Sequence, residues 1–91
     1  MKVIQTNRFR KAYQKLHPNQ LAGVNKAIKT IVGNPYIGEQ KKGSLSWLRV
    51  YKFKVFGQLV LLGYNAEKTD EIVLTLVSIG PHENFYRDLK K

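Results

Sequence analysis

Cysteine is absent from the sequence, and acidic residues are scarce. Of the 91 residues, 16 are Lys or Arg and 6 are Asp or Glu, so the formal net charge at pH 7 is +10. A chain without cysteine forms no disulfide, iron–sulfur cluster, thiolate zinc site or cysteine nucleophile, and it suits a reducing compartment. The excess of positive charge favours a partner that carries negative charge: nucleic acid, an anionic membrane surface or an acidic protein.

Long hydrophobic runs are also missing. The longest, Leu59 to Tyr64, has the length of a strand and falls far short of the roughly 20 apolar residues that cross a bilayer. Between Met1 and Lys11 only the pair Val3-Ile4 is apolar before a cluster of basic residues, which is unlike a signal peptide. These features predict a cytoplasmic protein with no membrane segment.

The N-terminal third predicts one strand and two helices. Residues 2–6 are expected to form a short strand, and Asn7 is expected to cap the helix that follows. The apolar residues of this helix recur at helical spacing: Phe9, Ala12, Tyr13 and Leu16. A second helix is predicted from about Asn19 to Val32, with Gly33 as its C-terminal cap, and the two helices are expected to form an antiparallel hairpin.

The rest of the chain predicts a sheet. A basic loop is expected at 34–46, strands at 47–55, 58–64 and 71–79, and a short helix at 82–90 opened by Pro81. Phe56-Gly57 marks a tight hairpin turn and 65–70 a polar turn. We therefore predict one α+β domain, residues 1–91, with the N-terminal strand and helical hairpin packed on an antiparallel sheet.

The predicted strand at 47–55 has two different faces. Tyr51 and Phe53 alternate with Lys52 and Lys54, so the aromatic side chains are expected to face the helices and the lysines to face away from them. Two cations on one open face can bind a phosphate or assist a proton transfer. An ordinary solvated strand face explains the same pattern.

Familiar cofactor motifs are missing. Gly38 to Gly43 has the glycine spacing of a phosphate-binding loop, but Ser44-Leu45 stands where Lys followed by Ser or Thr is required. His17, His82 and the six carboxylates show no metal-ligand spacing. We therefore predict neither a metal nor a cofactor.

The strongest chemical pattern combines the end of one strand with the start of the last helix. It consists of Arg49, Lys52, Lys54, His82, Tyr86 and Arg87. His82 is expected at a helix N-terminus, where free N–H groups and the helix dipole attract phosphate, and this position suits a general acid. Tyr86, one turn later, shares its face and can stack on a base. Packing of the last helix on the sheet is the structural alternative for Tyr86.

With these residues the sequence resembles a known family. The order of elements, the run Leu48 to Val55 and the ending Ile79 to Leu89 resemble the RelE/ParE superfamily of toxins from bacterial type II toxin–antitoxin systems. Asn34-Pro35 after the second helix and Lys42 to Leu45 before the next strand are also similar to this family. The resemblance covers essentially the whole chain and implies a RelE-like fold.

The resemblance implies a function as well. RelE-type members are mRNA interferases, ribosome-dependent endoribonucleases that make a 2′-hydroxyl of messenger RNA attack the adjacent phosphate. By this resemblance the catalytic residues are Lys52, Lys54, His82 and Tyr86, with His82 protonating the leaving 5′-oxygen. Phosphate-binding roles fall to Arg49, Lys41, Lys42, Gln58 and Arg87. The implied partners are a cognate acidic antitoxin and messenger RNA on the ribosome.

One position departs from the RelE pattern. Leu61 stands where RelE-like enzymes usually carry an arginine, three residues before Tyr64, and Gln58 is a weaker substitute. ParE-type toxins share the fold, lack the ribonuclease residues and inhibit DNA gyrase by binding it, so a non-enzymatic gyrase inhibitor is the main alternative. A basic RNA-binding module without toxicity is the third. The sequence leaves these alternatives open.

Overall fold

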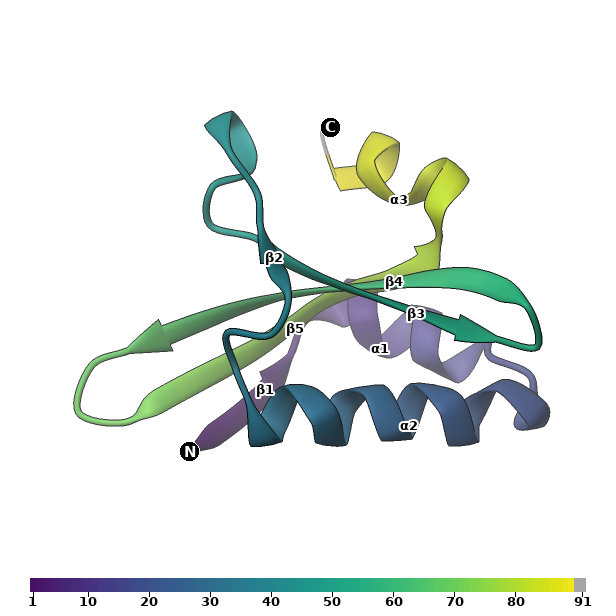
Figure 1. The fold of residues 1–91 in the computed structure, drawn as a ribbon, viewed down its shortest axis with the longest axis horizontal. Coiled ribbons are helices and arrows are strands. Elements are labelled where there is room, and N and C mark those ends of the chain that lie inside the picture. Colours follow the sequence, from purple (N-terminus) through teal and green to yellow (C-terminus); the bar gives the residue numbers. More distant parts are fainter. Residues whose placement is uncertain (90–91) are drawn as a thin grey trace.

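The molecule consists of a mixed β-sheet with helices on both of its faces (Figure 1). The computed structural model describes residues 1–89, apart from the side chains at positions 83, 84, 87 and 88. The elements are β1 (Lys2–Gln5), α1 (Asn7–Gln14), α2 (Pro18–Gly33), β2 (Glu39–Gln40), the short 3-10 helix η1 (Gly43–Leu45), β3 (Arg49–Val55), β4 (Gln58–Lys68), β5 (Ile72–Pro81) and α3 (His82–Leu89). Helices α1 and α2 cover one face of the sheet, and α3 lies over the other.

The strands lie in the order β1-β5-β4-β3-β2. The predicted antiparallel meander of β3, β4 and β5 is confirmed, and so is the α+β class. The prediction that the whole sheet is antiparallel is wrong, because β1 pairs with β5 in parallel. Two α-helices, the short 3-10 helix and three strands separate β1 from β5 in sequence, and a connection of this length allows strands to run in the same direction.

Several element boundaries differ from the prediction at their ends. Thr6, not Asn7, caps α1: its hydroxyl accepts a hydrogen bond from the N–H of Phe9 (3.1 Å) and donates one to the carbonyl of Val77 on β5 (2.9 Å). Helix α2 begins at Pro18, and Gly33 lies inside the helix, which ends at a cap formed by Asn34. The cap of α1 thus depends on a contact with β5, which local sequence does not encode.

The predicted loops are partly strands. Residues 34–46 contain β2 and η1, β3 begins at Arg49 instead of Trp47, and β4 continues through Lys68. The predicted polar turn at 65–70 is therefore wrong over residues 65–68, because the ladder with β5 outweighs the polar composition. The hairpin turn at Phe56-Gly57 is confirmed, since both residues have positive φ (50° and 79°), as the tight turns of β-hairpins require.

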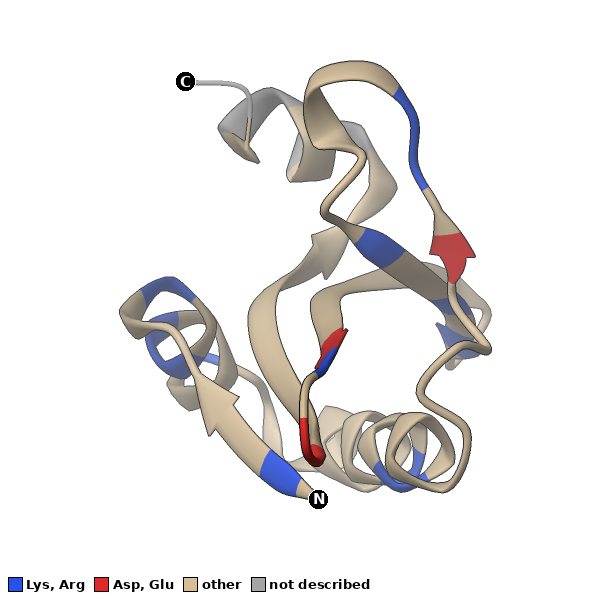
Figure 2. Cartoon of the chain, turned by 90° about the vertical axis from the view of Figure 1, so that its left-hand side faces the viewer, with Lys and Arg blue, Asp and Glu red and all other residues tan. Residues whose placement is uncertain are grey.

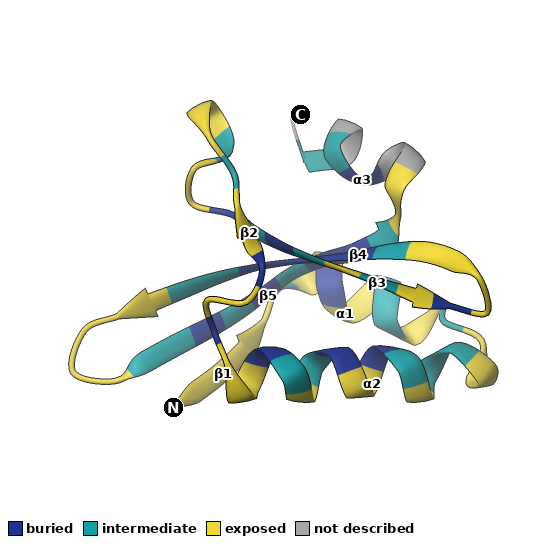
Figure 3. Ribbon diagram, viewed as in Figure 1, coloured by how far each residue is buried: buried dark blue, intermediate teal, exposed yellow. Residues whose placement is uncertain are grey.

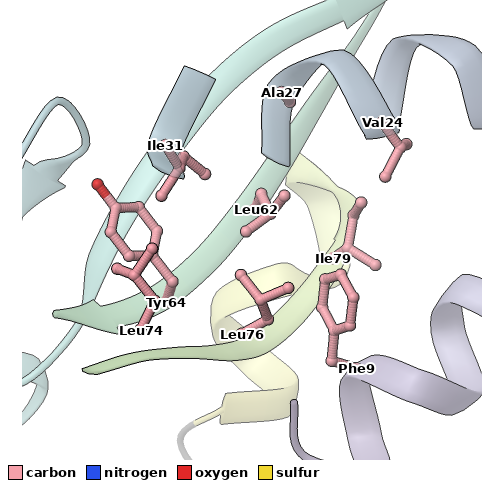
Figure 4. Close-up of a cluster of buried hydrophobic side chains, with 9 residues drawn as sticks. All are labelled: Phe9, Val24, Ala27, Ile31, Leu62, Tyr64, Leu74, Leu76 and Ile79. Carbon is pink, nitrogen blue, oxygen red and sulfur yellow. The ribbon is translucent and has the colours of Figure 1, made fainter. Parts of the chain in front are cut away.

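Two hydrophobic clusters lie on opposite sides of the sheet. The larger one, on the side of α1 and α2, contains Phe9, Val24, Ala27, Ile31, Leu62, Tyr64, Leu74, Leu76 and Ile79 (Figure 4). The smaller one contains Leu48, Val50, Leu61 and Phe85 and attaches α3. Figure 3 shows the buried positions along the middle of β4 and β5 and on the inner side of α2. Tyr51 and Phe53 pack against the larger cluster, so the predicted assignment of the two faces of β3 is confirmed.

Candidate functional site

Helix α3 places two predicted catalytic side chains next to each other. His82 is the exposed first residue of the helix, and Tyr86 follows one turn later and is half-buried. Their ring centroids lie 6.1 Å apart with an interplanar angle of 80°. Phe85, 3% exposed, anchors the helix in the smaller cluster. A Cβ on Gly63 of β4 would come within 2.7 Å of the Phe85 ring, so a glycine there lets the helix approach the sheet closely.

Lys41, in the segment between β2 and η1, reaches Tyr86 from the far edge of the sheet. Its Nζ lies 5.3 Å from the centroid of the Tyr86 ring, within cation–π distance, and it donates a hydrogen bond to the Glu39 carboxylate. The hydrogen bond with Glu39 and, after it, the contact with Tyr86 raise the pKa of Lys41 above its ordinary value. Lys41 is therefore a cation at neutral pH and is poorly suited to act as a base.

Among the described side chains, Glu39 contributes a carboxylate to this basic surface. The hydrogen bond with Lys41 lowers its pKa most, and the charges of Lys41, Lys52 and Lys42 act in the same direction. Sequence reasoning did not single out Glu39, because no motif distinguishes an isolated acid in a basic segment. Its position two residues before Lys41 is the one available signal, since alternate residues of a strand share a face.

Lys52 and Lys54 project from the same side of the sheet as α3. Lys52 is exposed and lies directly opposite Leu61 of β4, a residue of the cluster beneath α3. Lys54 lies opposite Leu59, and the alternation of the strand places it on the same face as Lys52. Figure 2 shows basic positions on β3 and on the segment after β2, with an acidic position of β2 beside them. We define the α3-side site as Lys41, Lys52, Lys54, His82 and Tyr86.

The Tyr86 hydroxyl is a distinctive feature of the α3-side site. Its oxygen is buried, and none of the described side chains or backbone groups forms a full hydrogen bond with it. A buried hydroxyl without a partner costs about 1–3 kcal/mol.

Arg49 does not join the α3-side site. It alternates with Lys52 and projects from the other face, where its guanidinium donates to the carbonyls of Tyr36 (3.2 Å) and Gly38 (2.9 Å) and to the side chain of Gln40 (3.4 Å). The guanidinium also stacks over the Tyr36 ring at 5.0 Å. These contacts hold the segment between α2 and β3 in place, and they favour a structural role over the predicted phosphate contact.

The remaining predicted residues are dispersed. Gln58 lies opposite Val55, whose side chain packs against α2 at Gly23, so Gln58 projects from the face away from α3. Lys42 is exposed and adds to the field at Glu39. The side chain of Arg87 lies outside the described part of the structure.

Leu61 occupies the position where an arginine was expected. It is 0% exposed and packs with Phe85, on the face from which Lys52 projects. The position thus lies on the α3-side face, but the leucine side chain packs beneath α3 and carries no charge that could bind a ligand.

The described part of the chain contains neither a metal-ligand cluster nor a membrane-spanning helix. Across residues 1–89, as far as side chains are described, no three His, Cys, Asp or Glu residues are grouped as metal ligands would be. None of the described helices combines the length and the apolar character that a membrane span requires.

Known proteins resemble the chain in fold. Residues 3–90 match a family model described as the ParE-like toxin of type II bacterial toxin–antitoxin systems. A chain of the intact E. coli RelBE toxin–antitoxin complex is similar with a TM-score of 0.71 and 20% identity, over 90% of this chain and 96% of that chain. The isolated E. coli RelE toxin gives a TM-score of 0.69 and 18% identity over 98% and 95% of the two chains. The expected RelE-like fold is thus confirmed, while no curated protein sequence matches.

Proposed function

Since the chain belongs to the family of ParE-like toxins of type II bacterial toxin–antitoxin systems, we propose that it is a cytoplasmic, ribosome-dependent endoribonuclease built as one domain over residues 1–91. In this proposal a 2′-hydroxyl of messenger RNA attacks the adjacent phosphate. The observation that carries the proposal is the convergence of Lys41, Lys52, Lys54, His82 and Tyr86 on one face of the sheet. RelE, the toxin of the similar solved structures, also favours this reading.

Each side chain of the α3-side site has a role in this reaction. His82, exposed at the start of α3, protonates the leaving 5′-oxygen. Lys52 and Lys54 stabilise the charge that develops on the phosphate, and one of them assists deprotonation of the 2′-hydroxyl. Lys41, whose pKa is raised by Glu39, remains a cation and binds a non-bridging phosphate oxygen. Tyr86, whose ring lies beside His82 and Lys41, orients the phosphate.

A non-enzymatic inhibitor of DNA gyrase is the second candidate. The burial of Leu61 favours it, as do the directions of Arg49 and Gln58, because the described part of the α3-side site then contains no arginine. Loss of one side chain that binds the reacting phosphate typically costs about 3–4 kcal/mol of transition-state stabilisation. If the chain cleaves RNA, the lysines and His82 must supply the transition-state stabilisation that an arginine would otherwise provide.

The two candidates are separated by following messages and DNA after brief induction. Primer extension on translated messages detects cuts in RNA, and mapping of DNA ends detects breaks at gyrase sites. The ribonuclease proposal expects new message ends that disappear when a 2′-deoxynucleotide replaces the scissile nucleotide in a ribosome-bound message. Intact messages together with gyrase-dependent DNA breaks would establish the second candidate instead.

The proposed protein partner is a cognate acidic antitoxin. One of the similar solved structures is a RelE mutant in complex with a peptide of the antitoxin RelBc (TM-score 0.69, 20% identity, covering 90% of this chain and 83% of that chain). In this chain an open, mostly apolar cleft of about 540 Å³ lies between β1, α1 and α2. Val3 and Ile4 on its rim are 44% and 43% exposed. We propose that an apolar segment of the antitoxin lies in this cleft and that its acidic residues face the basic surface around it.

A further inference from the structure

A second groove lies between α2 and β3, on the sheet face away from α3. Its volume is about 210 Å³, and it is lined by Gly23, Lys26, Ala27, Thr30, Tyr51, Phe53 and Lys54. The roles proposed above assign no ligand to this groove, which we call the α2–β3 groove. Free small molecules usually occupy pockets of roughly 300–1,000 Å³, so its size suits one unit of a longer chain better than a whole ligand.

The groove opens along a free edge of the sheet. In the described part of the chain, β2 pairs with β3 only at Arg49 and Val50. From Tyr51 to Val55 none of the described strands covers the outer edge of β3. An extended polymer can therefore approach the groove from the side without displacing part of the sheet.

The floor of the groove includes two aromatic rings. Tyr51 and Phe53 are stacked with centroids 5.8 Å apart and an interplanar angle of 21°. Both are half-buried, so part of each ring packs on the larger cluster and part borders the groove. Aromatic rings fixed in this way serve as stacking surfaces for nucleobases whatever the base.

One cation on this face flanks the rings. Lys26 on α2 is exposed, and it forms no ion pair with a carboxylate of the described residues. Lys54 borders the groove as part of the edge strand, while strand alternation directs its side chain to the α3 face. The hydroxyl of Thr30 donates to the carbonyl of Lys26 (3.0 Å), which leaves its oxygen able to accept a further hydrogen bond. A cation beside an aromatic surface matches a stacked base and its adjoining phosphate.

We propose that the α2–β3 groove binds one nucleotide of a single-stranded RNA segment, with the base against Tyr51 and Phe53 and the phosphate beside Lys26. The proposal rests on the proposed function for the presence of RNA near the chain. An extended acidic peptide is the competing occupant. The aromatic pair and the lack of any acidic residue in the lining favour RNA, since a peptide strand gains little from two parallel rings.

The experiment measures binding of a fluorescent oligouridylate of about eight nucleotides, a length within the usual range of single-strand sites, by anisotropy without ribosomes. Lys26→Ala is expected to weaken binding about fivefold to tenfold at low salt and to reduce the slope of log K against log salt by about 0.7. Lys29→Ala is the matched control: it removes an exposed lysine of α2 that does not line the groove. Its effect is expected to be less than about twofold because it disturbs only the general field.

Tyr51→Leu tests the stacking surface and is expected to weaken binding roughly tenfold or more. Because Tyr51 also packs on the larger cluster, photocrosslinking of 4-thiouridine RNA to the wild-type chain provides a readout that does not depend on folding of a variant. We expect the crosslink to map to Tyr51 or Phe53. Equal losses in Lys26→Ala and Lys29→Ala would overturn the proposal, as would crosslinks confined to other elements.

Two further arms separate the alternatives. If a polyglutamate peptide binds with the same dependence on Lys26 and RNA does not, the groove is a peptide site and the RNA proposal is wrong. Ribosome-dependent cleavage is followed in parallel, where Lys26→Ala is expected to raise the ribosome concentration needed for half-maximal cleavage and to leave the maximal rate unchanged. A chain that fails to cleave but binds RNA through Lys26 would contradict only the proposed function.

Discussion

The hydroxyl of Tyr64 and the N–H of Gly38 form a buried hydrogen bond of 2.8 Å. The same hydroxyl donates to the carbonyl of Pro35 at 2.8 Å, and Tyr64 is 0% exposed. A Cβ at Gly38 would come within 2.7 Å of the hydroxyl and 2.8 Å of the ring. This contact ties the centre of β4 to the segment that leads into Glu39 and Lys41.

Gly38→Ala is expected to destabilise the fold by about 1–3 kcal/mol, because a buried ring and backbone must move apart. Tyr64→Phe is expected to cost about 1–3 kcal/mol, since it leaves the N–H of Gly38 unsatisfied. Chemical denaturation measures both. Gly33→Ala is the control: no atom lies within 4 Å of the added Cβ, and alanine favours a helix. Equal stability of Gly38→Ala and Gly33→Ala would contradict the role assigned to this contact.

Tyr64 also predicts a dependence of stability on pH. Burial raises its pKa above the ordinary value for tyrosine, against the opposing effects of the Gly38 N–H and Arg49. A group with a raised pKa in the folded state contributes stability that is present below the unfolded pKa and lost as pH rises through the folded one. The free energy of unfolding is therefore expected to fall above about pH 10. The fall should be smaller in Tyr64→Phe, and identical profiles for the two proteins would be inconsistent with this assignment.

The paired lysines of β3 give a prediction that separates function from folding. Lys52→Ala combined with Lys54→Ala is expected to reduce toxicity and to change stability by less than about 0.5 kcal/mol, because both side chains are exposed. Phe53→Ala, between them, is expected to cost about 1–3 kcal/mol because the ring packs on the larger cluster. Growth assays and circular dichroism supply the two readouts. Unfolding of the double lysine variant would reject the proposed separation.

The proposed role of His82 as general acid predicts how far cleavage slows when this residue is replaced. His82→Gln keeps a similar volume and some hydrogen bonding but removes the transferable proton, so cleavage of ribosome-bound messages is expected to slow by about 10²–10⁴-fold. The fold is expected to be unchanged, since His82 is exposed. Lys29→Gln, a change of an exposed residue on α2, is the control. An unchanged cleavage rate in His82→Gln would remove this residue from the mechanism.

The charge of +10 predicts fast capture by the acidic antitoxin. Electrostatic steering raises association rates of oppositely charged proteins and weakens with salt. The association rate constant, measured by stopped-flow fluorescence, is expected to fall steeply as salt rises, while the dissociation rate constant changes little. A rate independent of salt would argue against steering by this surface.

Much of the fold follows from local patterns in the sequence. The alternation of Tyr51 and Phe53 with Lys52 and Lys54 predicts both faces of β3, and Phe56-Gly57 predicts the turn after it. Other features depend on distant partners. The cap of α1 involves β5 through Thr6, and the polar end of β4 is a strand because it pairs with β5. Periodicity within a short window contains no information on such contacts.

The candidate site also combines contacts that local sequence predicts with contacts that depend on distant residues. His82 and Tyr86 are one turn apart on a helix, so sequence spacing is enough to predict that they meet. The contact of Lys41 with Tyr86 joins residues that are far apart in sequence, and it depends on the packing of α3 on the sheet through Phe85. Arg49 shows the reverse error: its charge suggested a phosphate contact, but strand alternation directs it toward Tyr36 and Gly38.

The pairing of β1 with β5 has a consequence for the order of events during synthesis. β1 is synthesised before β5 and cannot pair until β5 is present, since Lys2 pairs with Val73 and Gln5 with Leu76. Pairings between such distant segments form late and slowly. The larger cluster also lacks Leu74, Leu76 and Ile79 until the last strand has been made. A nascent chain therefore cannot complete the larger cluster before β5 has been translated, and the α3-side site forms only once α3 has followed β5.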